Sequence, residues 1–115
     1  MLAALGLRLV RHEIAEESMV PALRPGDWVL GVRRPQRLRT GDVVVFDLRP
    51  GFEVVKRVSP PPAGTHGLWL LGDNPAAGSV DSRMFGPVSA DRIKSRLLLR
   101  YQPRPVQAIP PPPGS

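Results

Sequence analysis

Ser18 and Lys56 are the two side chains whose types and surroundings suit catalysis. A serine hydroxyl is a weak nucleophile until a base removes its proton. Lysine can be that base only when it is neutral, and lowering its pKa from about 10.4 to about 8 takes roughly 3 kcal/mol of preference for the neutral amine. Lys56 lies in the apolar stretch Val54-Val55-Lys56-Arg57-Val58, where burial can supply this preference. The pair therefore indicates a serine nucleophile served by a lysine base.

Each of these residues also has a simpler interpretation. Ser18, with a proline soon after it, fits a helix N-cap, and Lys56 fits an exposed position on an edge strand. His12 and His66 have no carboxylate at a recognisable spacing, so both are expected at the surface rather than as bases. The arginines cannot act as bases at neutral pH. The catalytic interpretation therefore depends on the order of several motifs and not on one residue.

The composition excludes several other chemistries. The chain has 115 residues, which allows one small domain, and a net charge of +6. It has no cysteine and only two histidines, without His-x-x-x-His spacing, so neither a metal nor another cofactor is predicted. The cluster of Arg33, Arg34, Arg37 and Arg39 is interpreted as a solvated surface. Aromatic residues do not alternate with the basic ones, so no nucleic-acid partner is predicted.

The segments that must position Ser18 and Lys56 have the pattern of β-strands. Apolar or loosely alternating runs follow turn signals such as Pro25-Gly26-Asp27 and Gly41-Asp42. Three consecutive prolines at 60–62 predict a loop, because proline cannot donate to a β ladder. The sequence therefore predicts a mainly β fold. The expected strands cover residues 28–32, 43–46, 52–58, 68–71 and 93–101.

Both ends of the chain are expected to lie outside this core. Residues 1–13 form a short N-terminal segment whose first ten residues are mostly apolar, about half of a bilayer span, with Arg8 among them. We expect a short helix packed on the domain there, and contact with a membrane surface is an alternative. The catalytic domain is expected over residues 14–102. The proline-rich tail, 103–115, is expected to be disordered or extended.

Four motifs, in this order, resemble the type I signal peptidase family of serine–lysine proteases. They are a nucleophile box over 18–27, a strand over 41–46, a lysine box over 56–58, and a closing box that begins at Gly72-Asp73-Asn74 and continues through 79–88. The resemblance covers about residues 17–100. It implies a small antiparallel β catalytic core like that of signal peptidases and LexA.

The same resemblance implies a role for each site residue. Ser18 would be the nucleophile and would offer its backbone N–H to the oxyanion, and Lys56 would be the general base. Ser79 would accept a hydrogen bond from Lys56 and orient it. The remaining site residues are the bracing ion pair Asp81 and Arg83, and the substrate-pocket residues Met19 and Pro21.

Two positions depart from the family pattern. Glu16 stands where the family usually has serine or glycine, and a carboxylate near a developing oxyanion is unfavourable unless it points away or is paired. The segment between Asn74 and Ser79 is one residue longer than the commonest spacing. We expect Gly78 to absorb the extra residue as a bulge.

The chain shows neither the family's transmembrane anchor nor its inserted cap domain, and so resembles the anchorless maturation proteases of nickel-type superoxide dismutase. This resemblance predicts a cytoplasmic serine endopeptidase that removes an N-terminal propeptide from the dismutase precursor. Its partner would be that protein or peptide substrate. Three alternatives stay open: a membrane-associated signal peptidase at the membrane periphery, a LexA-like self-cleaving domain, and an inactive peptidase-like binding module.

Overall fold

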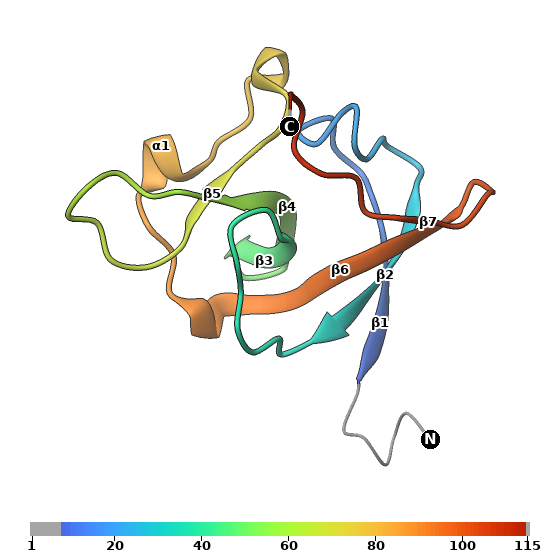
Figure 1. Ribbon diagram of the computed structural model, residues 1–115, viewed down its shortest axis with the longest axis horizontal. Helices are drawn as coiled ribbons and strands as arrows, with labels where there is room; N and C mark the ends of the chain where they lie inside the picture. The colour runs from blue at the N-terminus through green and yellow to red at the C-terminus, as the bar shows by residue number, and fades with distance from the viewer. Residues whose placement is uncertain (1–7, 115) are drawn as a thin grey trace.

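The computed structural model describes residues 8–114, which are built around one antiparallel sheet (Figure 1). The order of its strands is β1-β2-β6-β3-β4-β5, and β7 pairs with β6. The mainly β fold class predicted above is confirmed. The strands are β1 (Leu9–Glu13), β2 (Trp28–Arg33), β3 (Val43–Arg49), β4 (Phe52–Ser59), β5 (Trp69–Leu71), β6 (Ile93–Gln102) and β7 (Gln107–Ala108). The helical turns are η1 (Pro75–Ala77), α1 (Ser82–Phe85) and η2 (Ala90–Arg92).

The central strands are those with the most continuous apolar sequence. The first four residues of β3, Val43–Phe46, are all buried, because β3 lies between β4 and β6. β6 is the longest strand and pairs with β2, β3 and β7. The prolines at 60–62 lie in the loop between β4 and β5, as predicted. The sheet thus holds β4, which carries Lys56, between two neighbours.

The sheet curls until its first strand meets β4. In the sheet order β2, β6 and β3 separate β1 from β4, yet His12 on β1 lies 3.5 Å from the carboxylate of Glu53 on β4. Figure 1 shows the same curvature, since β6 runs across the view while β3 and β4 are seen nearly end-on. Met19 and Leu23, from the β1–β2 loop, are buried in one hydrophobic cluster with Val29. This burial fixes the loop that contains Ser18 against the sheet.

The N-terminal segment differs from the expected helix. Leu9–Glu13 forms an edge strand paired with β2, and its side chains alternate between exposed and half-buried positions. This alternation is the pattern of a strand with one face on the domain. Residues 1–7, which hold the rest of the expected helix, lie outside the described residues.

The C-terminal tail, for which a disordered or extended chain was expected, forms the short strand β7 and packs on the domain. β7 pairs with β6, and Ile109 packs against the hydrophobic cluster around Met19. The carbonyl of Pro110 accepts a 3.1 Å hydrogen bond from Arg57. Proline lacks an N–H but keeps its carbonyl acceptor, and here a buried arginine uses it.

Candidate active site

Lys56 is buried in the middle of the sheet. It lies on β4 opposite Val44 of β3, and only 1% of its surface is exposed. Its side chain shares a face of β4 with Val54 and Val58, which are also buried. The amine donates a 3.0 Å hydrogen bond to Ser79 Oγ, which is the contact that the sequence predicts. The alternative of an exposed edge-strand lysine is therefore wrong.

The surroundings of Lys56 favour its neutral form. Burial lowers the pKa of Lys56 below its usual value, and the nearby carboxylates of Glu16 and Asp81 oppose this by stabilising the ammonium. The net direction is downward because removal of the charge from water dominates. A lysine with a lowered pKa is neutral in a larger fraction of molecules at a given pH, as a general base requires.

Ser18 lies in the β1–β2 loop, directly above β4. It is 2% exposed, and its hydroxyl donates a 3.3 Å hydrogen bond to the carbonyl of Val55, the residue before Lys56. Ser18 opens a turn and does not cap a helix. Within residues 8–114, no direct hydrogen bond joins Ser18 Oγ to Lys56 Nζ. The Ser18 hydroxyl thus lies next to β4 but bonds the backbone carbonyl of Val55, not the Lys56 amine.

Gly72 and Asn74, in the loop after β5, connect Ser18 to Ser79. The N–H of Asn74 donates to the carbonyl of Ser18 at 2.8 Å, and its side-chain amide donates to the carbonyl of Glu17 at 3.0 Å. A Cβ placed on Gly72 would lie 3.0 Å from the Ser18 carbonyl oxygen and 3.2 Å from Ser79 Oγ. Glycine therefore lets this loop pass between the two serines, which brings Ser18 beside the Lys56–Ser79 pair.

The extra residue before Ser79 forms part of a helical turn. η1 covers Pro75–Ala77, and the side chain of Asn74 caps it by accepting from the N–H of Ala76 at 3.2 Å. Gly78 ends the turn with φ +63°, a left-handed conformation in which glycine has no steric cost. Gly78 thus ends a 3₁₀ turn and does not form the expected β-bulge.

Asp81 and Arg83 form the predicted ion pair. The guanidinium donates to the carboxylate twice, with Nη2–Oδ2 at 2.8 Å and Nε–Oδ1 at 3.2 Å. The Asp81 side chain is 3% exposed, whereas that of Arg83 is 60% exposed. Burial alone would raise the pKa of Asp81, but hydrogen bonds from Arg83 and from the Gly72 N–H lower it. Asp81 is therefore an anion, and its carboxylate joins α1 to the loop at Gly72.

A second ion pair, between Arg57 and Asp73, was missed from the sequence. Two hydrogen bonds of 2.9 and 2.8 Å join them, and each side chain is 5% exposed. Arg57 also donates to the carbonyls of Gly41 and Pro110. The available signal was an arginine inside an apolar strand, because a buried guanidinium requires a carboxylate partner. This pair links the strand of Lys56 to the loop that contacts Ser18.

Two hollows lie at the site. Ser18 and Met19 line a small one of about 50 Å³. Lys56 and Ser79 line another of about 300 Å³. Glu16 lines both, so its half-buried carboxylate lies between them rather than in bulk solvent. Pro21 is exposed and lines neither hollow, so its predicted place in the substrate pocket is a misassignment.

The two histidines differ. His66 is exposed, as expected. His12 is half-buried, with Nε2 2.9 Å from Ser95 Oγ and Nδ1 3.5 Å from Glu53 Oε1, so the expectation of a surface histidine was wrong. Its carboxylate partner comes from a strand far along the chain, which no local spacing reveals. His12 also lines the small hollow beside Ser18.

No protein-family model matches the chain, and no curated protein sequence matches it. Within residues 8–114 no helix is long and apolar enough to cross a bilayer. The function is therefore inferred from the order of the motifs and the geometry of the site.

Proposed function

We propose that this protein is a serine endopeptidase in which Ser18 is the nucleophile and Lys56 the general base. The observation that carries the proposal is the buried amine of Lys56, which donates a hydrogen bond to Ser79. Lys56 lies on β4, the strand whose backbone Ser18 contacts. An amine removed from water gives up its proton more readily, and it can then accept one from a serine hydroxyl.

In the proposed reaction, the Ser18 side chain turns from the Val55 carbonyl toward the neutral Lys56 amine. Catalytic hydrogen bonds in substrate-free enzymes are often long and tighten only when substrate binds. Lys56 takes the hydroxyl proton as Ser18 Oγ attacks the scissile carbonyl, and it gives that proton to the departing amine. Lys56 then takes a proton from water, whose oxygen attacks the acyl-enzyme, and returns that proton to Ser18 Oγ as the bond to the acyl group breaks.

The backbone N–H of Ser18 is suited to stabilise the oxyanion. Within residues 8–114 it donates to no acceptor, so it is available to a negatively charged oxygen. Glu16 opposes this role, because its carboxylate is close enough to raise the pKa of Lys56. A bound peptide that shields Glu16 from both groups would remove this conflict.

The substrate we propose is the precursor of a nickel-type superoxide dismutase, from which an N-terminal propeptide is removed in the cytoplasm. This assignment follows the resemblance in motif order. Apolar side chains also line the hollow beside Lys56, including Leu48, Phe52 and Val54. Such a hollow is suited to an apolar side chain of the peptide.

The test is to mix the purified protein with the dismutase precursor and to read intact masses. We expect a mass loss equal to the propeptide, and no loss with Ser18→Ala or Lys56→Ala. His66→Ala is the matched control, because His66 is exposed and outside the site. Full cleavage by Lys56→Ala would refute the mechanism, even if the substrate were correct.

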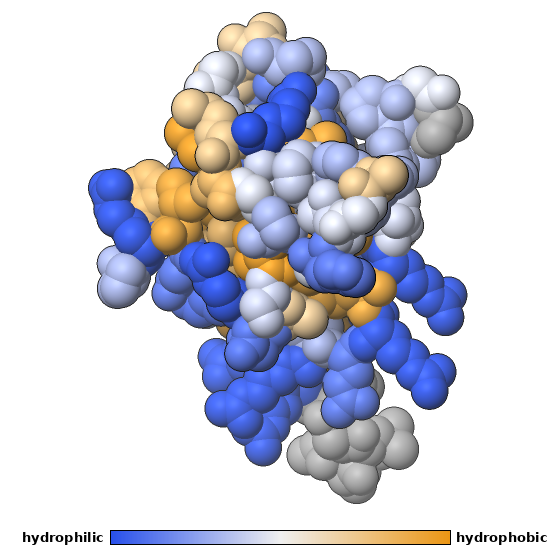
Figure 2. All heavy atoms as spheres, turned by 90° about the vertical axis from the view of Figure 1, so that its left-hand side faces the viewer, coloured by the Kyte–Doolittle hydropathy of each residue, from blue (hydrophilic) through white to orange (hydrophobic). Residues whose placement is uncertain are grey.

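Two other functions have a specific observation in their favour. The proximity of Glu16 to Lys56 favours an inactive binding module, which would bind the precursor without changing its mass. Hydrophobic side chains on the face that carries α1 favour a signal peptidase at the membrane periphery (Figure 2). That enzyme would cleave a secretory signal peptide and leave the dismutase precursor intact, and it would sediment with membranes.

A further inference from the structure

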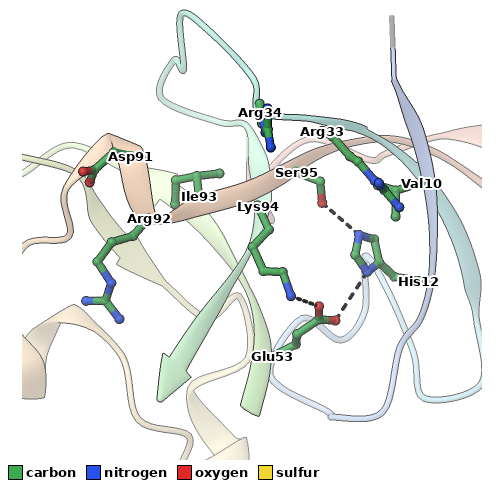
Figure 3. A pocket seen from close by; sticks show the side chains of 10 residues that line it. All are labelled: Val10, His12, Arg33, Arg34, Glu53, Asp91, Arg92, Ile93, Lys94 and Ser95. Atoms are coloured by element: carbon green, nitrogen blue, oxygen red, sulfur yellow. Dashed lines mark hydrogen bonds and ion pairs between the residues drawn. The ribbon is translucent and has the colours of Figure 1, made fainter. Parts of the chain in front are cut away.

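A third hollow, of about 420 Å³, adjoins the site (Figure 3). It shares His12 and Glu53 with the small hollow of Ser18, so the two have a common wall. The end of β2, the start of β6 and the turn before β6 supply most of its charged side chains. These are Arg33, Arg34, Arg92 and Lys94, with Glu53 and Asp91 as the acidic members.

The positive charge of this basic hollow is only partly neutralised. Lys94 bonds the carboxylate of Glu53, which also faces His12 (Figure 3). In the described part of the chain, by contrast, the guanidinium groups of Arg33 and Arg34 have no hydrogen-bond or ion-pair acceptor. Both residues are exposed. Two guanidinium groups at the edge of one hollow leave a local excess of positive charge.

The backbone holds Arg34 in a costly conformation. Its φ of +48° is in the left-handed region, which is unfavourable for a residue with a Cβ. The N–H of Arg34 donates a 3.0 Å hydrogen bond to the carbonyl of Lys94, which ties this turn to β6. Such strain persists where surrounding structure enforces it, and it occurs often at ligand sites. The turn therefore places Arg34 at the hollow.

We propose that the basic hollow binds a side-chain carboxylate of the peptide whose scissile bond is presented to Ser18. This inference rests on the proposed function, because His12 and Glu53 line both hollows and so place the basic hollow next to that of Ser18. Guanidinium groups bind carboxylates through paired hydrogen bonds. A nucleic acid fits less well, because among the described residues no Phe, Tyr or Trp lines the hollow to stack on its bases.

The experiment measures binding to ¹⁵N-labelled Ser18→Ala protein, which cannot proceed to cleavage. The probe is a short Ala/Ser peptide that carries three glutamates, and its counterpart carries glutamines. We expect the glutamate peptide alone to shift the amide signals of Arg33, Arg34 and Ser95. Adding Arg33→Gln and Arg34→Gln should weaken binding at least about tenfold.

The matched control is Arg37→Gln with Arg39→Gln, which removes the same charge from exposed residues outside the hollow. It should leave the affinity within about twofold. Arg33→Lys with Arg34→Lys keeps the charge but loses the paired hydrogen bonds, so it should bind more weakly than the unsubstituted arginines and more tightly than the glutamine pair. Equal affinity for the two peptides would overturn the proposal. It would also be overturned if inorganic phosphate or oligothymidylate displaced the peptide at a lower concentration. If the wild-type protein cleaved peptides with no preference for glutamate, only the proposed carboxylate site would be refuted. If glutamate-dependent binding occurred but the wild type cleaved nothing, only the proposed Ser18 mechanism would be refuted.

Discussion

Lys56 Nζ and Ser79 Oγ lie 3.0 Å apart, and this hydrogen bond joins the central strand β4 to the loop that follows η1. A serine hydroxyl both donates and accepts. Ser79 can therefore accept from the protonated lysine and donate to the neutral amine. The contact can therefore orient the Lys56 amine in both of the charge states that the proposed catalysis requires.

Ser79→Ala should lower kcat by about ten- to a hundredfold with little change in KM, because an unoriented base transfers protons less efficiently. The measurement is steady-state cleavage of the precursor. Ser89→Ala is the control, since Ser89 is exposed and lies outside the site. A variant with wild-type kcat would show that Ser79 does not position Lys56.

Lys56→Met should abolish cleavage and raise the free energy of unfolding. The pKa of Lys56 is lowered in the folded state, so the unfolded chain binds more protons between the folded and the usual pKa. The free energy of unfolding of the wild type should therefore rise as the pH increases through the folded pKa of Lys56. At pH values below that pKa, the buried ammonium lowers the free energy of unfolding. Methionine removes both the cost and this pH dependence.

Urea unfolding at several pH values between neutrality and about 10 would measure this effect. The gain from Lys56→Met should be largest at neutral pH and should shrink as the pH rises. A gain that does not vary with pH would indicate that improved packing, not the buried amine, is responsible.

Glu16→Gln should move the acid limb of the pH–rate profile to lower pH. The Glu16 carboxylate raises the pKa of Lys56 by stabilising its ammonium, so its removal lowers that pKa further. More of the lysine is then neutral at pH 7, and cleavage should be faster there. Glu17→Gln is the control, because Glu17 is exposed and does not affect Lys56. If the acid limb of the variant stayed at the wild-type pH, Glu16 would not influence the pKa of Lys56.

Asp73→Asn should destabilise the protein by about 3 to 5 kcal/mol, because it leaves the buried Arg57 guanidinium without its carboxylate. Lys94→Gln is the matched control. It also breaks an ion pair, but Lys94 and its partner Glu53 are both exposed, so stability should change much less. Chemical denaturation measures both. If the two variants lost similar amounts of unfolding free energy, burial would not explain the stability that the Arg57–Asp73 ion pair contributes.

The sequence allows good predictions wherever local pattern and local packing agree. The run Val43–Phe46 predicts a buried strand and is one, because a central strand covered on both faces needs no polar residues. Asp81 and Arg83 are two residues apart, so their contact follows from the short chain between them. Motif order predicts Ser18, Lys56 and Ser79 as site residues; in the structure Lys56 bonds Ser79, and Ser18 bonds the carbonyl of the residue before Lys56.

Other features need the tertiary structure. The tail was expected to be disordered or extended, and its composition does not reveal that Arg57 bonds the carbonyl of Pro110. The contact of His12 with Glu53 exists only because the sheet curls until β1 meets β4. The sequence by itself determined most of the strands, which depend on neighbouring residues and on periodicity, and its motif order led us to propose Ser18 as nucleophile and Lys56 as base. Only the tertiary structure decided how far Lys56 is desolvated and which charges face it, because burial and Coulomb interactions depend on distances in space.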